Sequence, residues 1–258
     1  VRLRTAACGI CATDLEMISR CGRTGFPSVP GHEWAGTVDA VGPGVDPDLV
    51  GIRCVADNVL SDGGEVGFEH PGGYAAGLIT EAANLYPLPD DFDLAAATLI
   101  EPLAVCVRGV RRLEPRNLSR ALIFGDGAIG LLMVPLLKRE GVKEIVVVGG
   151  RSGRLALAKE LGADATYDYR ALGSPLGAAV LRAHGDPFPT VVEASGSPDA
   201  ARAAVETGDH DARVLILGDY ADARADLLWN DILHREIVLI GSNAGTGAWS
   251  EAVVLATG

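Results

Sequence analysis

A short glycine-rich motif, Gly125-Asp-Gly-Ala-Ile-Gly130, restricts the possible folds of this chain more than any other feature. It follows the apolar run 121–124 and opens a second apolar run, residues 131–134, that suits a helix. Glycines at such a strand-to-helix turn allow a tight bend and let a pyrophosphate approach the helix N-terminus. A glycine-rich turn without a ligand is the alternative, but the two apolar runs favour a dinucleotide-binding loop. We expect the loop to use Gly125, Gly127, Ala128, Ile129 and Gly130.

The pattern around this motif predicts a chain of class α/β. From residue 121 onward, short apolar runs alternate with helix-like segments, which is typical of a parallel sheet covered on both faces. The expected strands are residues 121–125, 144–148, 190–194, 213–217 and 237–240. The first part of the chain is instead rich in glycine and proline, with short β-like runs. We expect a small β-rich domain over 1–93, a helical bridge over 94–113 and a dinucleotide-binding domain over 114–258.

Three residues before the glycine motif offer side chains of the types that zinc accepts. Cys11, His32 and Glu101 supply a thiol, an imidazole and a carboxylate, and three protein ligands leave a fourth position open for water or substrate. Glu101 lies in an apolar stretch, where a carboxylate is costly to bury without a partner such as a metal. Cys8 and Cys11 could instead form a redox pair or half of a structural zinc site, but no second Cys-x-x-Cys completes four thiolates. We interpret the remaining thiols as small hydrophobic core residues: Cys8, Cys54 and Cys106.

The sequence context of these residues is similar to that of a known family. The segments are Cys8-Gly-Ile-Cys-Ala-Thr-Asp14, Pro30-Gly-His-Glu-Trp-Ala-Gly36 and Leu99-Ile-Glu-Pro-Leu103. In this order, and followed by the glycine motif, they resemble the zinc-dependent medium-chain dehydrogenase/reductase family over nearly the whole chain. The polyol, sugar and threonine dehydrogenase branches are the most similar. The resemblance implies a GroES-like β-rich catalytic domain and a Rossmann domain with a doubly wound parallel sheet.

The resemblance also implies roles for the residues around the metal. Cys11 and His32 are expected as zinc ligands, with Glu101 as the third. Glu33 follows His32 directly and can ligate in place of Glu101 or exchange with it. Asp14 is the expected partner that fixes the tautomer of His32.

Thr13 is the candidate for the first proton transfer, because its hydroxyl both donates and accepts hydrogen bonds. In the family the relay usually ends at a histidine three residues further along, where this chain has Glu16. A carboxylate can serve as the terminal base, but the departure weakens the carry-over. Capping of a helix start is the alternative role for Thr13. The candidate catalytic residues are Thr13, Glu16 and Glu33.

The end of the second Rossmann strand distinguishes the two dinucleotides, because NAD enzymes place an acidic residue there for the ribose diol. This chain has Gly149 in that position, followed by Gly150 and Arg151. The missing carboxylate would leave room for a 2′-phosphate, and the planar fork of Arg151 suits phosphate, although Arg151 could also be a solvated helix-start residue. Tyr169 matches a position near this phosphate in NADP-using relatives. We expect NADP, with NAD as the alternative, and a nicotinamide bordered by Gly241, Ser242 and Asn243.

Composition excludes several classes of partner. The formal net charge of -12 argues against nucleic acid and anionic membrane surfaces, and no apolar run approaches the ~20 residues of a membrane span. Five scattered cysteines do not suggest a disulfide framework and favour the cytoplasm. The chain begins at Val1 and stops at Gly258, so we expect it to be truncated at both ends relative to the family. We also expect a homodimer or homotetramer.

Together these features predict a zinc-dependent oxidoreductase that interconverts a secondary alcohol and its ketone by hydride transfer. The carboxylate in the ligand set resembles enzymes that act on polyols, sugars or cyclitols. Two alternatives stay open. One is a zinc-free quinone or enone reductase of the same superfamily, which would lack the three ligands. The other is a non-catalytic binding protein that has kept the fold.

Overall fold

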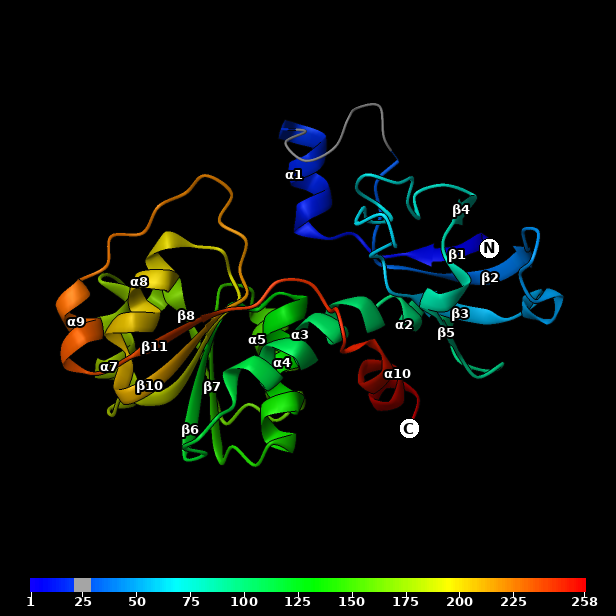
Figure 1. Ribbon diagram of the computed structural model, residues 1–258. Helices are drawn as coiled ribbons and strands as arrows, with labels where there is room; N and C mark the ends of the chain where they lie inside the picture. Colours follow the sequence, from blue (N-terminus) through cyan, green and yellow to red (C-terminus); the bar gives the residue numbers. More distant parts are fainter. Residues whose placement is uncertain (21–28) are drawn as a thin grey trace. The chain divides into compact units, whose positions relative to one another are not determined.

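The computed structural model describes residues 1–20 and 29–258, so Cys21 lies outside the described residues. The backbone divides into two compact units, one formed by residues 1–105 with 244–258 and the other by residues 106–243 (Figure 1). Among the described residues, no helix has the length and apolar character that crossing a membrane requires.

The first unit contains a five-stranded sheet in the order β4-β1-β2-β3-β5, with antiparallel neighbours throughout. Its strands are β1 (Arg2–Cys8), β2 (Trp34–Ala40), β3 (Arg53–Ala56), β4 (Gly77–Ile79) and β5 (Leu85–Pro87). The other elements are α1 (Ala12–Arg20), η1 (Pro47–Leu49), η2 (Ala82–Asn84), α2 (Leu94–Ala97), the start of α3 (Ile100–Leu113) and α10 (Trp249–Thr257). The β-rich first domain that the sequence predicts is confirmed.

Pairing of β1 with β2 positions the candidate metal ligands. The register places Cys8 opposite Trp34 after an irregularity between Thr5 and Ala7. The two chain segments just beyond this pair therefore lie side by side, and the Gly9 amide donates to the Glu33 carbonyl at 2.7 Å. The side of the sheet that carries Leu3, Trp34, Val38, Cys54 and Leu78 forms the buried core of this unit.

The second unit contains a six-stranded parallel sheet in the order β11-β10-β9-β6-β7-β8. Its strands are β6 (Arg120–Phe124), β7 (Glu144–Gly149), β8 (Ala165–Asp168), β9 (Phe188–Glu193), β10 (Gly208–Ile216) and β11 (Val238–Gly241). The strand order reverses direction between β6 and β9, as in a doubly wound Rossmann sheet. The α/β fold class is therefore confirmed.

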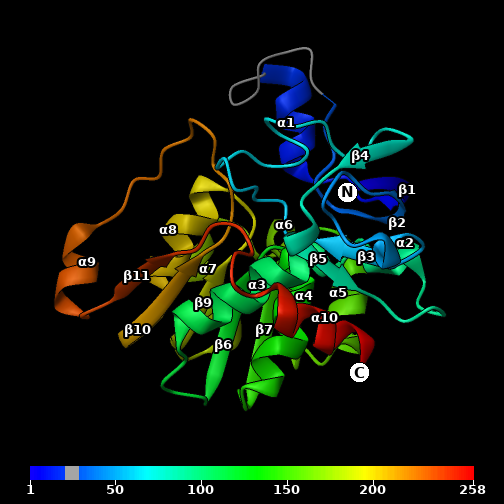
Figure 2. The same cartoon turned by 45° about the vertical axis from the view of Figure 1, so that its right-hand side comes forward.

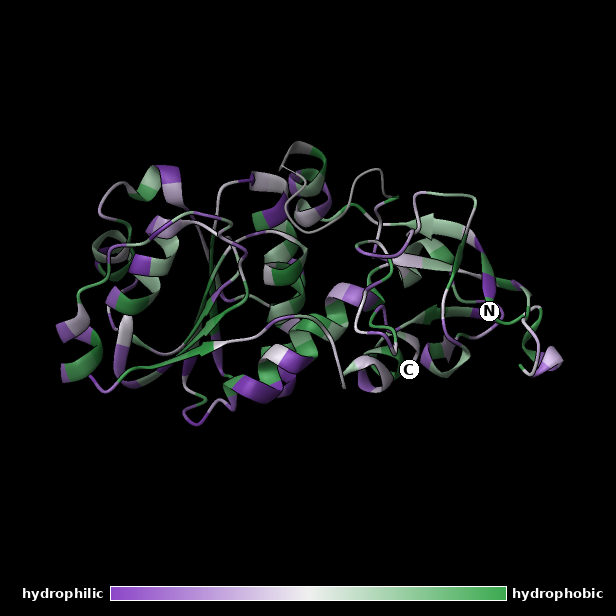
Figure 3. Cartoon of the chain, turned by 45° about the horizontal axis from the view of Figure 1, so that its top comes forward, coloured by the Kyte–Doolittle hydropathy of each residue, from purple (hydrophilic) through white to green (hydrophobic). Residues whose placement is uncertain are grey.

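Helices cover both faces of this sheet, as short apolar parallel strands require. They are α4 (Ala128–Arg139), α5 (Ser152–Glu160), α6 (Tyr169–Leu172), α7 (Leu176–His184), α8 (Pro198–Glu206) and α9 (Trp229–His234). In the views of Figure 1 and Figure 2, α4 and α5 lie on one face while α7 and α8 lie on the other. The strands between them are the most hydrophobic part of the unit (Figure 3), and β9 is buried along its whole length.

The boundaries differ from those expected in two respects. The bridge over 94–113 is not one helix, because α2 ends at Ala97 and α3 begins at Ile100. Pro102 is accommodated in the first turn of α3, where no intrahelical N–H bond is lost. Residues 244–258 belong with the first unit rather than with the second, because the ring of Trp249 in α10 stacks on Tyr86 of β5 with centroids 6.0 Å apart.

Candidate metal centre and dinucleotide-binding loop

Cys11, His32 and Glu33 lie together at the end of the β1–β2 pair. One ligand atom from each residue falls in a group whose members are all within 4.8 Å of one another. Cys11 directly precedes α1, and the other two directly precede β2. The pairing of Gly9 with Glu33 brings the two segments to this distance. Two predicted ligands and the proposed exchange ligand thus form one cluster.

Asp14 lies behind this cluster, fully buried in the first turn of α1. Its Oδ1 is 3.3 Å from Nδ1 of His32, and its Oδ2 accepts from the Cys11 amide at 2.9 Å. The Nδ1 contact has the distance of an ion pair but not the geometry of a hydrogen bond. Burial opposes ionisation of Asp14, but the contacts with His32 and the Cys11 amide outweigh it and hold the pKa of this carboxyl below its usual value. The charged carboxylate turns Nδ1 of His32 toward itself, which leaves Nε2 as the ring nitrogen for a ligand.

Glu101 lies in the first turn of α3 and is not part of the 4.8 Å group. Burial raises its pKa to about 8, although His32 acts in the opposite direction. Burial also raises the pKa of Glu33. For His32 burial lowers the pKa, but Asp14, Cys11 and Glu101 outweigh it and raise the value to about 11. The buried acidic groups thus favour a positive charge among them, and the donor set of thiol, imidazole and carboxylate fits Zn²⁺.

The hydroxyl of Thr13 lies at the edge of the cluster, where it accepts from the Cys11 thiol across 3.6 Å. Glu16 follows one turn later on α1 and does not belong to the group of ligand atoms. The structure therefore brings Thr13 next to a candidate ligand. Of the other thiols, Cys54 and Cys106 are buried as expected, whereas Cys8 is only partly buried.

The sequence did not predict the residues that contact Asp14 and His32 from other segments of the first unit. The hydroxyl of Tyr74 lies 2.8 Å from Oδ2 of Asp14 and 2.9 Å from the Gly9 carbonyl. Asn58 donates to the His32 carbonyl at 2.7 Å, and the Phe68 ring lies 4.8 Å from the imidazole between centroids. The only sequence signal was an aromatic residue after the Gly72-Gly73 pair, and nothing local links it to α1.

The glycine motif forms the turn between β6 and α4 that the sequence predicts. Gly125 has φ +117°, a value that favours glycine, and a Cβ on Gly130 would collide with the Gly125 carbonyl. Gly127 is the N-cap of α4 and has no side-chain cap, and nothing lies within 4 Å of where its Cβ would be. The first amides of this 12-residue helix, which include those of Ala128 and Ile129, are thus open to an anion.

A pocket of 530 Å³ lies beside this turn, at the carboxyl ends of β6, β7 and β9. Of the predicted cofactor-binding residues, Gly125, Gly149, Gly150 and Tyr169 line this pocket, whereas the exposed Arg151 does not. The expectation that Gly149 itself leaves room for a phosphate is corrected, because a Cβ there would lie 2.5 Å from Cβ of Asp126. Oδ2 of Asp126 accepts from the amides of Gly150 and Arg151 at 2.9 and 2.7 Å.

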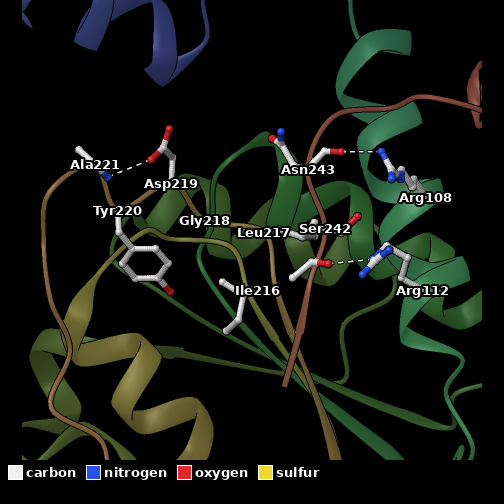
Figure 4. A pocket seen from close by; sticks show the side chains of 11 residues that line it. Arg108, Arg112, Ile216, Leu217, Gly218, Asp219, Tyr220, Ala221, Ser242 and Asn243 are labelled. Atoms are coloured by element: carbon white, nitrogen blue, oxygen red, sulfur yellow. Dashed lines mark hydrogen bonds between the residues drawn. The ribbon is translucent and has the colours of Figure 1, made fainter. Parts of the chain in front are cut away.

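Gly241, Ser242 and Asn243 line a different pocket, of 760 Å³, beyond β10 and β11 (Figure 4). Arg108 of α3 donates to the Asn243 carbonyl at 2.7 Å, and Arg112 donates to the Gly241 carbonyl at 2.8 Å. These two arginines were not predicted, and they fix the backbone after β11. The Ser242 hydroxyl is buried and makes no hydrogen bond within the described part of the chain.

A β-rich unit with a thiol–imidazole–carboxylate cluster, joined in one chain to a Rossmann unit, defines an oxidoreductase of the alcohol dehydrogenase type. The family model for the alcohol dehydrogenase GroES-like domain matches residues 1–90, and the model for zinc-binding dehydrogenases matches residues 128–257. The chain belongs to the zinc-binding dehydrogenase family, and the predicted resemblance is confirmed. Zinc and a nicotinamide dinucleotide, the expected cofactors, agree with this membership.

Individual relatives carry names of sugar-alcohol dehydrogenases. D-altritol 5-dehydrogenase of Agrobacterium fabrum is 30% identical over 267 residues, which cover 94% of this chain and 76% of the relative. Galactitol 1-phosphate 5-dehydrogenase of Escherichia coli K12 is 28% identical over 260 residues, which cover 94% and 75%. Among solved structures, a zinc-binding dehydrogenase from Sinorhizobium meliloti 1021 bound to NADP has a TM-score of 0.91 at 25% identity and covers 100% of this chain and 80% of that chain.

Proposed function

We propose that this chain is a zinc-dependent dehydrogenase that interconverts a secondary alcohol of a polyol, sugar or cyclitol with its ketone. The observation that most supports this function is the group of Cys11, His32 and Glu33, whose ligand atoms lie within 4.8 Å of one another beside the buried Asp14. A zinc-free quinone or enone reductase has no need of such a donor set. The names of the two sugar-alcohol dehydrogenases above support the substrate class.

Cys11, His32 and Glu33 would hold the metal, and Glu101 would exchange with Glu33 as the carboxylate ligand. Zinc, when bound, polarises an alcohol oxygen and lowers its pKa. The carboxylate of Asp14, 3.3 Å from Nδ1 of His32, would attract this side of the ring and so keep it in one orientation. Thr13 receives the proton of the alcohol, because its hydroxyl lies 3.6 Å from the Cys11 thiol and can accept and donate at once. We propose Glu16 as the acceptor at the outer end of this relay.

The dinucleotide would lie against the turn Gly125–Gly130, with its pyrophosphate at the open amides of α4. When bound, its nicotinamide exchanges the hydride with the substrate carbon. Gly241, Ser242 and Asn243 would border the nicotinamide, in the pocket beyond β11. We propose NADP as the preferred cofactor, since the residue at the end of β7 is Gly149 rather than an acidic residue, with Arg151 as an additional positive charge.

We also propose a cytoplasmic homodimer or homotetramer. The described cysteines are all free thiols, which suits a reducing compartment. Large apolar side chains are exposed on α9 and on the edge strand β11, and such patches mark contact surfaces. They are Trp229, Leu233, Val238 and Leu239.

A substrate panel tests the proposed activity. The zinc-loaded chain is mixed with NADP and a set of sugar alcohols and cyclitols, and NADPH formation is followed by absorbance. We expect oxidation of at least one secondary alcohol, loss of this activity with a chelator and recovery with Zn²⁺. Reduction of quinones or enones that is insensitive to the chelator would instead identify the zinc-free alternative.

A further inference from the structure

The pocket beside the glycine turn contains two positions that could carry an acidic side chain, Gly149 and Gly150 at the end of β7. Each is a glycine because another side chain already fills the space. At Gly149 that side chain is Asp126, whose Cβ lies 2.5 Å from where a new Cβ would be. At Gly150 a Cβ would collide with the ring of Tyr169 and would lie 3.1 Å from Nη1 of Arg170.

Tyr169 and Arg170 form one unit in front of Gly150. The guanidinium carbon of Arg170 lies 4.8 Å from the centroid of the Tyr169 ring, and Nη1 donates to the Gly150 carbonyl. Both residues begin the short helix α6 and line the pocket. Arg170 thus stands beside Gly150, one residue after the position where an NAD enzyme has its acidic residue, while the side chain of Asp126 stands beside that position, Gly149.

Arg170 is also the cation of this pocket that is least neutralised. Arg202, the other arginine of its lining, is paired with Asp199 at 2.6 Å. The ion pair between Nη1 of Arg170 and Oδ1 of Asp168 is longer, at 3.8 Å, and the side chain of Arg170 is 60% exposed. Within the described residues, its Nε and Nη2 donate to no other group. A guanidinium fork with free donors matches the geometry of a phosphate.

We propose that Arg170, supported by the ring of Tyr169, is the residue that recognises the 2′-phosphate of NADP. The proposal deepens the NADP preference stated above and rests on it. Arg151, the residue that the sequence singles out, is exposed and does not line the pocket. It contributes general positive charge, whereas Arg170 provides the specific contact.

Binding of two nucleotide fragments tests this assignment without turnover. The affinities of the full chain for adenosine 2′,5′-bisphosphate and for AMP are measured by isothermal titration calorimetry. Removal of a charged hydrogen-bond donor to a phosphate lowers affinity by on the order of 10- to 100-fold. We therefore expect Arg170→Ala to lose about this factor for the bisphosphate and to bind AMP within about twofold of the parent chain. Arg170→Lys should recover part of the loss, since it restores the charge without the fork.

Two matched variants give the comparison. Arg182→Ala removes an exposed arginine of α7 that does not line the pocket, and it should change neither affinity. Arg151→Ala should have a smaller effect on the bisphosphate than Arg170→Ala. Retained AMP binding shows that each variant is folded.

The possible outcomes distinguish the role of Arg170 from the NADP preference on which it rests. Full bisphosphate affinity in Arg170→Ala, with a loss in Arg151→Ala, would overturn the role of Arg170 while leaving the NADP preference in place. Equal affinity of the parent chain for both fragments would overturn the NADP preference and the proposal with it. Neither result would bear on the proposed metal-binding role of Cys11, His32 and Glu33.

Discussion

The carboxylate of Asp14 lies 3.3 Å from Nδ1 of His32. If Nε2 binds the metal, Nδ1 is the ring nitrogen that does not. The same carboxylate accepts a hydrogen bond from the Cys11 amide at 2.9 Å. One buried side chain therefore sets the orientation of the imidazole and anchors the backbone that carries the thiol.

Replacement of this carboxylate should weaken metal binding more than it weakens the fold. Asp14→Asn keeps the size of the side chain but removes its charge, so we expect zinc affinity to fall by about 10- to 100-fold. Competition with a chromogenic chelator measures this. Asp48→Asn, at an exposed position of η1, is the matched control and should bind zinc like the parent chain. An Asp14→Asn chain with unchanged affinity would show that Asp14 does not orient His32.

Loss of the Tyr74 hydroxyl should have a smaller effect. Tyr74→Phe removes one hydrogen bond to Asp14, while the amides of Cys11 and Gly31 continue to donate to it. We expect the free energy of unfolding to fall by about 1 kcal/mol, measured by urea denaturation. Tyr86→Phe, which removes a hydroxyl with no hydrogen bond in the described structure, should leave it unchanged; equal losses in both variants would contradict the account.

Two glycines of the dinucleotide turn should separate stability from binding. Gly130→Ala places a methyl group against the Gly125 carbonyl, so we expect a loss of about 1–3 kcal/mol of unfolding free energy. Gly127→Ala meets open space, so it should cost no more than about 1 kcal/mol as an N-cap change. Its methyl group would, however, hinder the approach of the pyrophosphate. Thermal melts and AMP titrations check both effects, and unchanged AMP binding in Gly127→Ala would count against the predicted loop.

The pair of Lys138 and Asp164 should make part of the stability depend on pH. Burial opposes ionisation of Asp164, but Lys138, with Nζ 2.7 Å from Oδ2, and the Ile145 amide outweigh it and hold the pKa of this carboxyl below its usual value. A depressed folded-state pKa stabilises the fold above about pH 4, and this contribution is lost as the pH falls through the folded-state value.

Because both side chains are partly exposed to solvent, Lys138→Met should cost less than about 1 kcal/mol at pH 7. The difference from the parent chain should shrink in urea titrations at successively lower pH. A difference that stays constant down to acid pH would mean that the charge pair contributes nothing.

Sequence reasoning succeeded where a local pattern determines the structure. The apolar runs of β6, β7 and β9 are buried on both faces, so their composition alone marks them. The strand β8 (Ala165–Asp168) was missed because its residues are only partly buried and include polar side chains. The glycine turn was found because its conformation depends on residues within the motif.

The missed features depend on contacts between distant residues. Tyr74 reaches Asp14 across 60 positions of the chain. Asp126 has no predicted role within the glycine motif, yet it fills the space beside Gly149 and accepts a hydrogen bond from the Gly150 amide. Arg170 follows Tyr169 directly, but only the fold shows that it faces Gly150. None of these relationships leaves a periodic signal in the sequence.

The zinc content of the chain and of its ligand variants tests the central claim most directly. The parent chain and the variants Cys11→Ala, His32→Ala, Glu33→Ala and Glu101→Ala are analysed by atomic emission after dialysis against buffer, with AMP titration as the control for an intact second unit. The account predicts about one zinc per parent chain and loss of zinc in Cys11→Ala and His32→Ala, with AMP binding retained. Either carboxylate variant alone should keep part of the metal, because the other carboxylate can replace the missing ligand. Zinc content unchanged in both Cys11→Ala and His32→Ala, or an active parent chain free of zinc, would contradict it.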